Sequence, residues 1–279
     1  MSYSFQTNVT SLVAQENLRV TSDFQSRTIT RLTSGFRINS SGDDAAGLAV
    51  ANKFRSDVAE LNQGVRNAND GVSTLHILDG GLNNISQILD SLKSLATQSA
   101  SDTFTGDRTT LNNQFTTLLG EINRQAANIG LASGGGTGGR FNATLSVYIG
   151  GGDTQAHAQV TIDLSGATNI ADSNGLGIAN DTVDTKAHAL TAITDLEAAV
   201  TALGKTQGAV GTGQNDLQFS IQLAQSQISN FSGAESGIRD ADVAAEAANL
   251  TKAQVLEQSS LAALSQANTA PQALLKLFQ

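Results

Sequence analysis

The sequence predicts a mainly α-helical protein whose long antiparallel coiled-coil helices form a rod, with a small β-hairpin insert and paired N- and C-terminal helices. Apolar residues recur at alternating steps of three and four over two long segments, which is the spacing of a coiled coil. The 279 residues include a single proline, so long helices can run without interruption. Tryptophan is absent and aromatic residues make up only 4% of the chain, which favours thin cores between helices.

The first long segment predicts one helix from Asp44 to about Ala100. Its apolar series is Phe54, Val58, Leu61, Val65, Ala68, Val72, Leu75, Leu78, Leu82, Ile85, Leu89, Leu92 and Ala96. The short step from Leu75 to Leu78 indicates a break in heptad phase. After a turn near residues 105–107, a shorter series predicts a helix that folds back antiparallel to the first: Leu111, Phe115, Leu118, Ile122, Ala126 and Ile129.

A second long seam predicts another helix in the C-terminal half. Its residues are Ile193, Leu196, Val200, Leu203, Gln207, Val210, Gln214, Leu217, Ile221, Ala224, Ile228 and Phe231. Residues 131–183, between the two seams, differ in kind. They open with the glycine-rich stretch SGGGTGG, and two segments, RFNATLSVYIG and AHAQVTIDL, alternate polar and apolar residues around the turn GGDTQ. This pattern predicts a β-hairpin.

Both ends of the chain carry narrow apolar stripes on a surface rich in Asn, Gln, Ser and Thr. A stripe of this width cannot bury itself, so each terminal helix needs a partner helix. We expect the two ends to pair and to pack against other subunits through Phe5, Leu12, Phe24, Leu32, Leu256, Ala263, Ala267, Leu274 and Leu277. The expected domains are therefore 1–42 with 238–279, 43–130 with 184–237, and the insert 131–183.

The stretch SSGDDAAGLAV, residues 40–50, predicts the start of the first long helix. Ser41, Asp43 and Asp44 are residue types that cap helix N-termini, and carboxylates are favoured by the exposed N–H groups there. Ala45, Ala46 and Gly47 follow as small residues that allow close packing. Asp240 and Asp242 have the same predicted role before the C-terminal helix. Glycines inside the helices are interpreted as close contact points, at Gly47, Gly64, Gly71, Gly80 and Gly81.

No motif in the sequence predicts catalysis, a cofactor or a metal. Gly134, Gly136 and Gly139 fit a dinucleotide-binding spacing, but the predicted order there is helix then strand, which is the reverse of that motif. The three histidines are far apart in sequence, and cysteine is absent. We therefore expect a protein that is not an enzyme, with no catalytic, cofactor or metal residues.

The net charge of −9 and the scattered cationic residues argue against nucleic-acid or anionic-membrane partners. The first 19 residues lack the basic and apolar regions of a secretory signal. We expect a soluble chain that, if it leaves the cell, does so without a cleaved signal.

Three long motifs resemble the bacterial flagellin family: RLTSGFRINSSGDDAAGLAVANKF (31–54), RNANDGVSTLHILDGGLNNI (66–85) and the tail IRDADVAAEAANLTKAQVLEQSSLAALSQANTAPQALLKLF (238–278). The resemblance covers about residues 1–130 and 185–279 in the family's order. It implies a subunit that self-assembles into a hollow helical filament for motility, exported by the flagellar type III apparatus and located outside the cell. Implied partners are other copies of the chain, an export chaperone, and junction and cap proteins.

The resemblance also implies a surface that innate immune receptors recognise. Recognised members carry Arg, Leu and Glu at three places where this chain has Ser91, Leu95 and Gln114, so only Leu95 matches. Two other functions stay open at this point. The related hook-filament junction protein shares a version of the first motif, but commonly has proline where this chain has Ala45. A filament-displayed adhesin would use residues 131–183.

Overall fold

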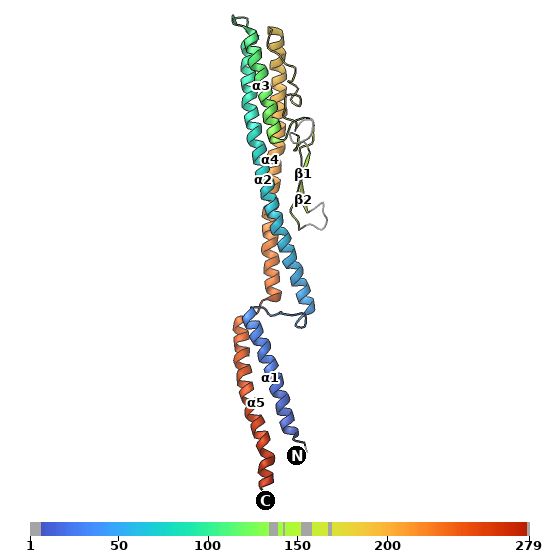
Figure 1. The fold of residues 1–279 in the computed structure, drawn as a ribbon, viewed down its shortest axis with the longest axis vertical. Coiled ribbons are helices and arrows are strands. Elements are labelled where there is room, and N and C mark those ends of the chain that lie inside the picture. The colour runs from blue at the N-terminus through green and yellow to red at the C-terminus, as the bar shows by residue number, and fades with distance from the viewer. Residues whose placement is uncertain (1–6, 134–138, 142, 152–157, 167–168, 278–279) are drawn as a thin grey trace. The chain divides into compact units, whose positions relative to one another are not determined.

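The computed structural model describes residues 7–133, 139–141, 143–151, 158–166 and 169–277, and side chains as far as residue 269. Its elements, drawn in Figure 1, are α1 (Val9–Ser34), α2 (Ala45–Ala100), α3 (Arg108–Ile129), β1 (Thr144–Tyr148), β2 (Gln159–Asp163), α4 (Lys186–Arg239) and α5 (Val243–Leu277). These elements confirm the mainly α-helical prediction. The predicted turn GGDTQ falls mostly outside the described residues.

The chain divides into two compact units. We call residues 1–56 and 230–279 the terminal unit, and residues 57–229 the central unit. The terminal unit holds α1, α5 and the adjoining ends of α2 and α4. The central unit holds the rest of α2 and α4 together with α3 and the two strands.

In the central unit, α2 buries one continuous heptad stripe. Its positions are Leu61, Gly64, Ala68, Gly71, Leu75, Leu78, Leu82, Ile85, Leu89, Leu92, Ala96 and Ser99, all of them buried. The predicted break in phase between Leu75 and Leu78 is therefore wrong. It arose because Val65 and Val72 were taken as core positions, whereas both are half-buried beside the true positions Gly64 and Gly71.

The stripe on α4 shows the same offset. Its buried positions are Ala189, Ala192, Leu196, Ala199, Leu203, Thr206, Val210, Gly213, Leu217 and Ala224. Every second core position on this stripe is a small residue. At one of them Ala199 is buried, whereas its larger neighbour Val200, which was predicted as the core residue, is 41% exposed. On α3, Leu119 is buried where Leu118 was expected. Two side-chain hydrogen bonds on the surface join α2 to α4: Lys93 donates to Glu197, and Gln207 donates to Asn83.

The β-hairpin covers α2 and α4, and three buried glycines make room for it. β1 and β2 pair antiparallel with Val147 opposite Val160. A Cβ on Gly64 would overlap the backbone of Ile149. One on Gly71 would stand 3.0 Å from Val147, and one on Gly213 would stand 2.8 Å from Ile162. Val147, Ile149 and Ile162 are buried as a result. The described part of the insert therefore contributes to the core of the central unit.

Among the described residues, no helix is apolar over a length that could span a membrane. The same residues contain no cluster of three His, Asp or Glu side chains arranged to hold a metal ion.

Candidate assembly interface

The two terminal helices pack against each other in antiparallel orientation. Near the start of α1, the Asn8 amide donates to the carbonyl oxygen of Ala267 at 2.9 Å, and Ser11 Oγ donates to Asn268 Oδ1 at 2.9 Å. Near the end of α1, Arg31 lies 3.4 Å from Glu246, at the start of α5. These contacts confirm the predicted pairing of the two terminal helices, and they show that the helices run in opposite directions.

The fully buried residues between the two helices are small or polar, and larger side chains beside them are half-buried. On α1 the buried and half-buried positions are Ser11, Ala14, Leu18, Thr21, Phe24, Gln25, Thr28, Arg31 and Leu32. On α5 they are Glu246, Asn249, Leu250, Ala253, Glu257, Ser260, Leu264 and Ala267. We call this contact the terminal seam. Small side chains bring the helices close, but they bury little apolar area, so the seam contributes modest free energy.

Large apolar side chains of the same two helices remain exposed. Nine of them are 42–60% exposed: Val9, Leu12, Val13, Val20, Ile29, Val243, Val255, Leu256 and Leu261. On α1, spacings of four and seven residues place Val9, Val13 and Val20 on one face, opposite the terminal seam. Burying a side chain of this size stabilises a complex by roughly 1.5–3 kcal/mol relative to full exposure. Val9, Val13 and Val20 therefore form an apolar face of α1 that no described residue of the chain covers, and the other exposed apolar residues lie on further sides of the two helices.

The charge of the chain is divided unequally between the two units. The terminal unit has nine Lys and Arg and nine Asp and Glu, and the central unit has seven and sixteen. The terminal unit is neutral, and the central unit carries the whole net charge of −9. Copies that pack through their terminal helices therefore add no net charge repulsion at that contact.

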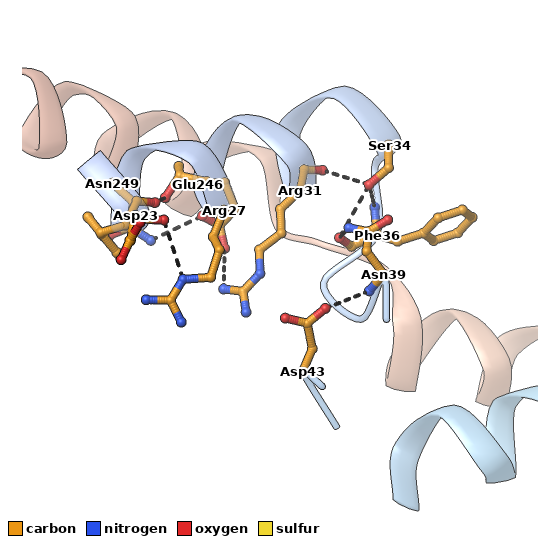
Figure 2. A network of polar contacts seen from close by, with 11 residues as sticks. Asp23, Arg27, Arg31, Ser34, Phe36, Asn39, Asp43, Glu246 and Asn249 are labelled. Atoms are coloured by element: carbon orange, nitrogen blue, oxygen red, sulfur yellow. Dashed lines mark hydrogen bonds and ion pairs between the residues drawn. The ribbon is translucent and has the colours of Figure 1, made fainter. Parts of the chain in front are cut away.

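A polar network fixes the turn at one end of the pair, as Figure 2 shows. Gly35 ends α1 with φ of 75°, and its N–H donates to Arg31. The turn is tied to the start of α5 because Ala241 N–H donates to the Gly35 carbonyl and Phe36 forms a bridge with Asp240. The guanidinium of Arg239 lies 4.1 Å from the Phe36 ring centre.

The cap of α5 is Asp242 and not Asp240. Asp240 belongs to the turn described above, where its carboxylate accepts a hydrogen bond from Ser236 Oγ. Asp242 is the cap, as predicted, because it accepts from the N–H groups of Ala244 and Ala245.

At the start of α2, Asp44 has the predicted capping role and Asp43 does not. Asp44 Oδ1 accepts from Gly47 N–H at 2.8 Å, which is the N-cap geometry. Asp43 closes the preceding turn by accepting from the backbone N–H groups of Ser40 and Asn39, and these bonds lower the pKa of Asp43. Ser41 is exposed and takes no part in the cap. Gly47 is packed closely, because a Cβ there would stand 2.9 Å from Ile38 Cδ1. Ala45 and Ala46 are exposed, so close packing at these two positions is not seen within the chain.

The predicted packing residues fall into three groups. Phe24, Leu32 and Ala267 are half-buried on the helix pair. Leu12, Leu256 and Ala263 are exposed, so these three do not join the two terminal helices, and their expected contact with other subunits stays a prediction. Phe5, Leu274 and Leu277 lie outside the described side chains. The prediction from sequence missed the buried residues Ser11, Ala14, Thr28 and Glu246, because it followed large apolar side chains; the uninterrupted heptad spacing was the signal that could have found them.

Leu95 lines a groove between α2 and α3 in the central unit. The groove has a volume of about 660 Å³ and is lined by Ser91, Ser94, Leu95, Thr110, Asn113, Gln114, Thr117 and Leu118. The structure brings together the three positions that the resemblance singled out, and every lining side chain is uncharged.

Comparison with known proteins matches both halves of the chain to one family. The bacterial flagellin N-terminal helical region matches residues 5–129, and the bacterial flagellin C-terminal helical region matches residues 193–278. Flagellin FlaB1 of Treponema pallidum (strain Nichols) is 31% identical over 281 residues, and flagellar filament core protein flaB2 of Brachyspira hyodysenteriae is 32% identical over 283 residues; each match covers 98% of both chains. A crystal structure of Bacillus cereus flagellin aligns with a TM-score of 0.47 and 22% identity, covering 57% of this chain and 88% of that one. This chain therefore belongs to the bacterial flagellin family.

Proposed function

We propose that this chain is a structural subunit that self-assembles into the helical filament of the bacterial flagellum and so serves motility. In this proposal the chain leaves the cell through the flagellar type III export apparatus. An export chaperone and the junction and cap proteins are its further partners. Relatives similar over nearly the whole chain are named as flagellins or flagellar filament core proteins, which supports the filament role.

The observation that carries the proposal is the set of large apolar residues exposed on the two terminal helices. A two-helix pair has one shared surface, and here its fully buried residues, Ser11, Ala14, Thr28, Glu246 and Ala253, are small or polar. Large apolar residues such as Val9, Val13 and Val20 are exposed outside that surface, so they are available for contact with other copies of the chain. Many copies that pack these faces together would each gain contacts on several sides, which favours a polymer.

The experiment compares two substitutions at one exposed position. Val20→Asp places a charge on the face opposite the terminal seam, and burying it between copies costs several kcal/mol per subunit. Val20→Ile keeps the face apolar. Electron microscopy of the purified chains should show filaments for the unmodified chain and for Val20→Ile, and none for Val20→Asp. Circular dichroism should show equal helical content in all three, since Val20 is exposed in the single chain. Normal filaments from Val20→Asp would contradict the proposal.

A further inference from the structure

A tight turn in the insert begins at a buried aspartate, Asp172, which is 5% exposed. One carboxylate oxygen of Asp172 accepts from the backbone N–H of Ser133 at 2.6 Å and from the Ser133 hydroxyl group. The other oxygen accepts from Gly175 N–H at 2.8 Å. The next residue, Ser173, donates its N–H to Asn123 Oδ1 of α3 at 2.9 Å. The start of the turn is therefore fixed to α3 and to the segment that follows α3.

Three backbone hydrogen bonds close residues 172–178, which we call the capped turn. Their N–H donors and carbonyl acceptors are Leu176 and Asp172 at 2.9 Å, Gly177 and Asn174 at 3.1 Å, and Ile178 and Ser173 at 2.9 Å. Gly177 has a left-handed φ of 78°. The last two bonds and the left-handed glycine form the Schellman pattern that ends helices. The capped turn is therefore held by hydrogen bonds at both its start and its end.

The capped turn contains the only Asn-Gly pair of the sequence, Asn174 and Gly175. Asn174 is exposed. Glycine is required at the second position, because a Cβ on Gly175 would overlap the side chain and the carbonyl oxygen of Ile170. An asparagine loses its side-chain amide most readily before glycine, since no Cβ hinders attack by the following backbone nitrogen. The packing that requires Gly175 therefore also makes Asn174 chemically vulnerable.

In the folded chain, both sides of the peptide group between Asn174 and Gly175 are held. Its carbonyl oxygen accepts from Gly177 N–H, and its own N–H donates to Asp172. Loss of the side-chain amide requires this peptide nitrogen to lose its proton and to reach Cγ of Asn174. Both hydrogen bonds must break before the peptide group can turn in this way. The closed turn therefore protects Asn174, and local opening exposes it to reaction.

We propose that Asn174 is a deamidation site, which the capped turn protects and which reacts when that turn opens. In the open turn, base in the solvent removes the proton of the Gly175 nitrogen. The nitrogen bonds to Cγ of Asn174, and the Cγ–Nδ2 bond breaks with release of ammonia. Water then opens the resulting succinimide ring at either carbonyl group, which leaves aspartate or isoaspartate at position 174. Neither product reverts to asparagine, so the modified fraction increases with the total time that the turn has been open.

The test uses the full-length chain at a concentration too low for assembly, so it does not depend on whether the chain polymerises. The chain is incubated in mildly alkaline buffer, with and without unfolding by guanidinium chloride, and its peptides are mapped by mass spectrometry. In the unfolded chain, Asn174 should convert faster than every other asparagine. In the folded chain, Asn174 should convert at least about tenfold more slowly than in the unfolded chain. Faster conversion of another asparagine on unfolding, or equal rates at Asn174 in the two samples, would overturn the proposal.

Two matched variants separate the cap of this turn from a general effect of losing an aspartate. Asp172→Ala removes the acceptor of Gly175 N–H, so Asn174 in the folded chain should convert roughly 3- to 30-fold faster. Asp107→Ala removes the N-cap of α3, where Asp107 accepts from Thr109 N–H, and should leave the rate at Asn174 unchanged. Equal rates in the two variants would contradict the protective role of Asp172.

Circular dichroism checks that both variants fold. If Asp172→Ala does not fold, Ser133→Ala takes its place, because it removes only the hydroxyl group that donates to Asp172. Ser133→Ala should accelerate the conversion of Asn174 in the same direction and by a smaller factor. An unchanged rate in that variant would contradict the protection by the anchored cap.

Discussion

Gly64 of α2 lies so close to Ile149 that a Cβ on the glycine would overlap the Ile149 carbonyl group. Both residues are buried, and Ile149 directly follows β1. The absence of a side chain at Gly64 lets the backbone of the hairpin meet the backbone of the helix. This contact explains why a glycine occupies a core position in a helix of 56 residues, where glycine is otherwise unfavourable.

Gly64→Ala should destabilise the central unit. Helix propensity alone would favour alanine by about 1 kcal/mol, but overlap with the backbone of Ile149 forces the hairpin to move, at a cost of about 1–3 kcal/mol or more. Gly80→Ala is the control on the same helix, because nothing lies within 4 Å of a Cβ there, and it should raise stability. Thermal unfolding followed by circular dichroism measures both. Equal stabilisation by the two variants would show that the hairpin contact is not tight.

Asp44→Ala should weaken the start of α2. The carboxylate accepts from Gly47 N–H, and losing an N-cap side chain costs about 0.5–2 kcal/mol. Asp44→Asn keeps an oxygen in place and should cost less. Ser41→Ala should have no measurable effect, because Ser41 is exposed and outside the cap. Denaturant unfolding of the three variants checks the order, and a larger loss for Ser41→Ala than for Asp44→Ala would contradict it.

Acid should remove the contribution of Asp43. Its pKa is lowered by the backbone N–H groups of Ser40 and Asn39, so the ionised form is favoured in the folded chain. A lowered pKa gives a contribution that is present above the unfolded value of 3.8 and is lost as the pH falls below it. Asp43→Asn should therefore reduce the loss of stability between pH 5 and pH 3. Melting temperatures across this range test the sign, and an unchanged acid slope would contradict it.

The terminal helices should exchange their amide hydrogens faster than α2 in the dilute chain. The terminal seam buries Ser11, Ala14 and Thr28, which offer little apolar area to offset the ordering of two helices. Leu82 and Leu89 of α2 are fully buried in the central unit. Exchange measured before and after assembly should show protection of α1 and α5 rising strongly on assembly. Protection equal to that of α2 before assembly would show that the pair is stable alone.

Periodicity was enough to predict each helix and the hairpin, because spacings of 3.6 and 2 residues survive wherever one face is buried. It failed at alternate core positions. Gly64, Gly71 and Gly213 are core residues because the hairpin fills the space above them, and Ala199 and Thr206 are likewise small core residues on α4. At such positions the prediction chose the adjacent residue with the larger apolar side chain as the core residue. It did so because the local sequence does not show that the hairpin packs on these helices.

The candidate interface shows the same limit. The sequence predicted that the two ends pair, but it could not separate residues that face the partner helix from residues that face outward. Ala253 and Leu256 both fit the predicted stripe, yet the first is buried in the terminal seam and the second is 42% exposed.

Thiol labelling in the two states tests the central claim most directly, because the chain has no cysteine of its own. Single cysteines at Val20 and at Leu256 would report on exposed apolar positions of α1 and α5. Ala126→Cys, buried in α3, is the control that should react slowly in both states. We predict that Val20→Cys and Leu256→Cys react rapidly in the dilute chain and become protected in sedimented polymer, where neighbouring copies cover them. Equally rapid labelling of both positions in the polymer would show that these exposed residues are not at the contact through which the chain assembles.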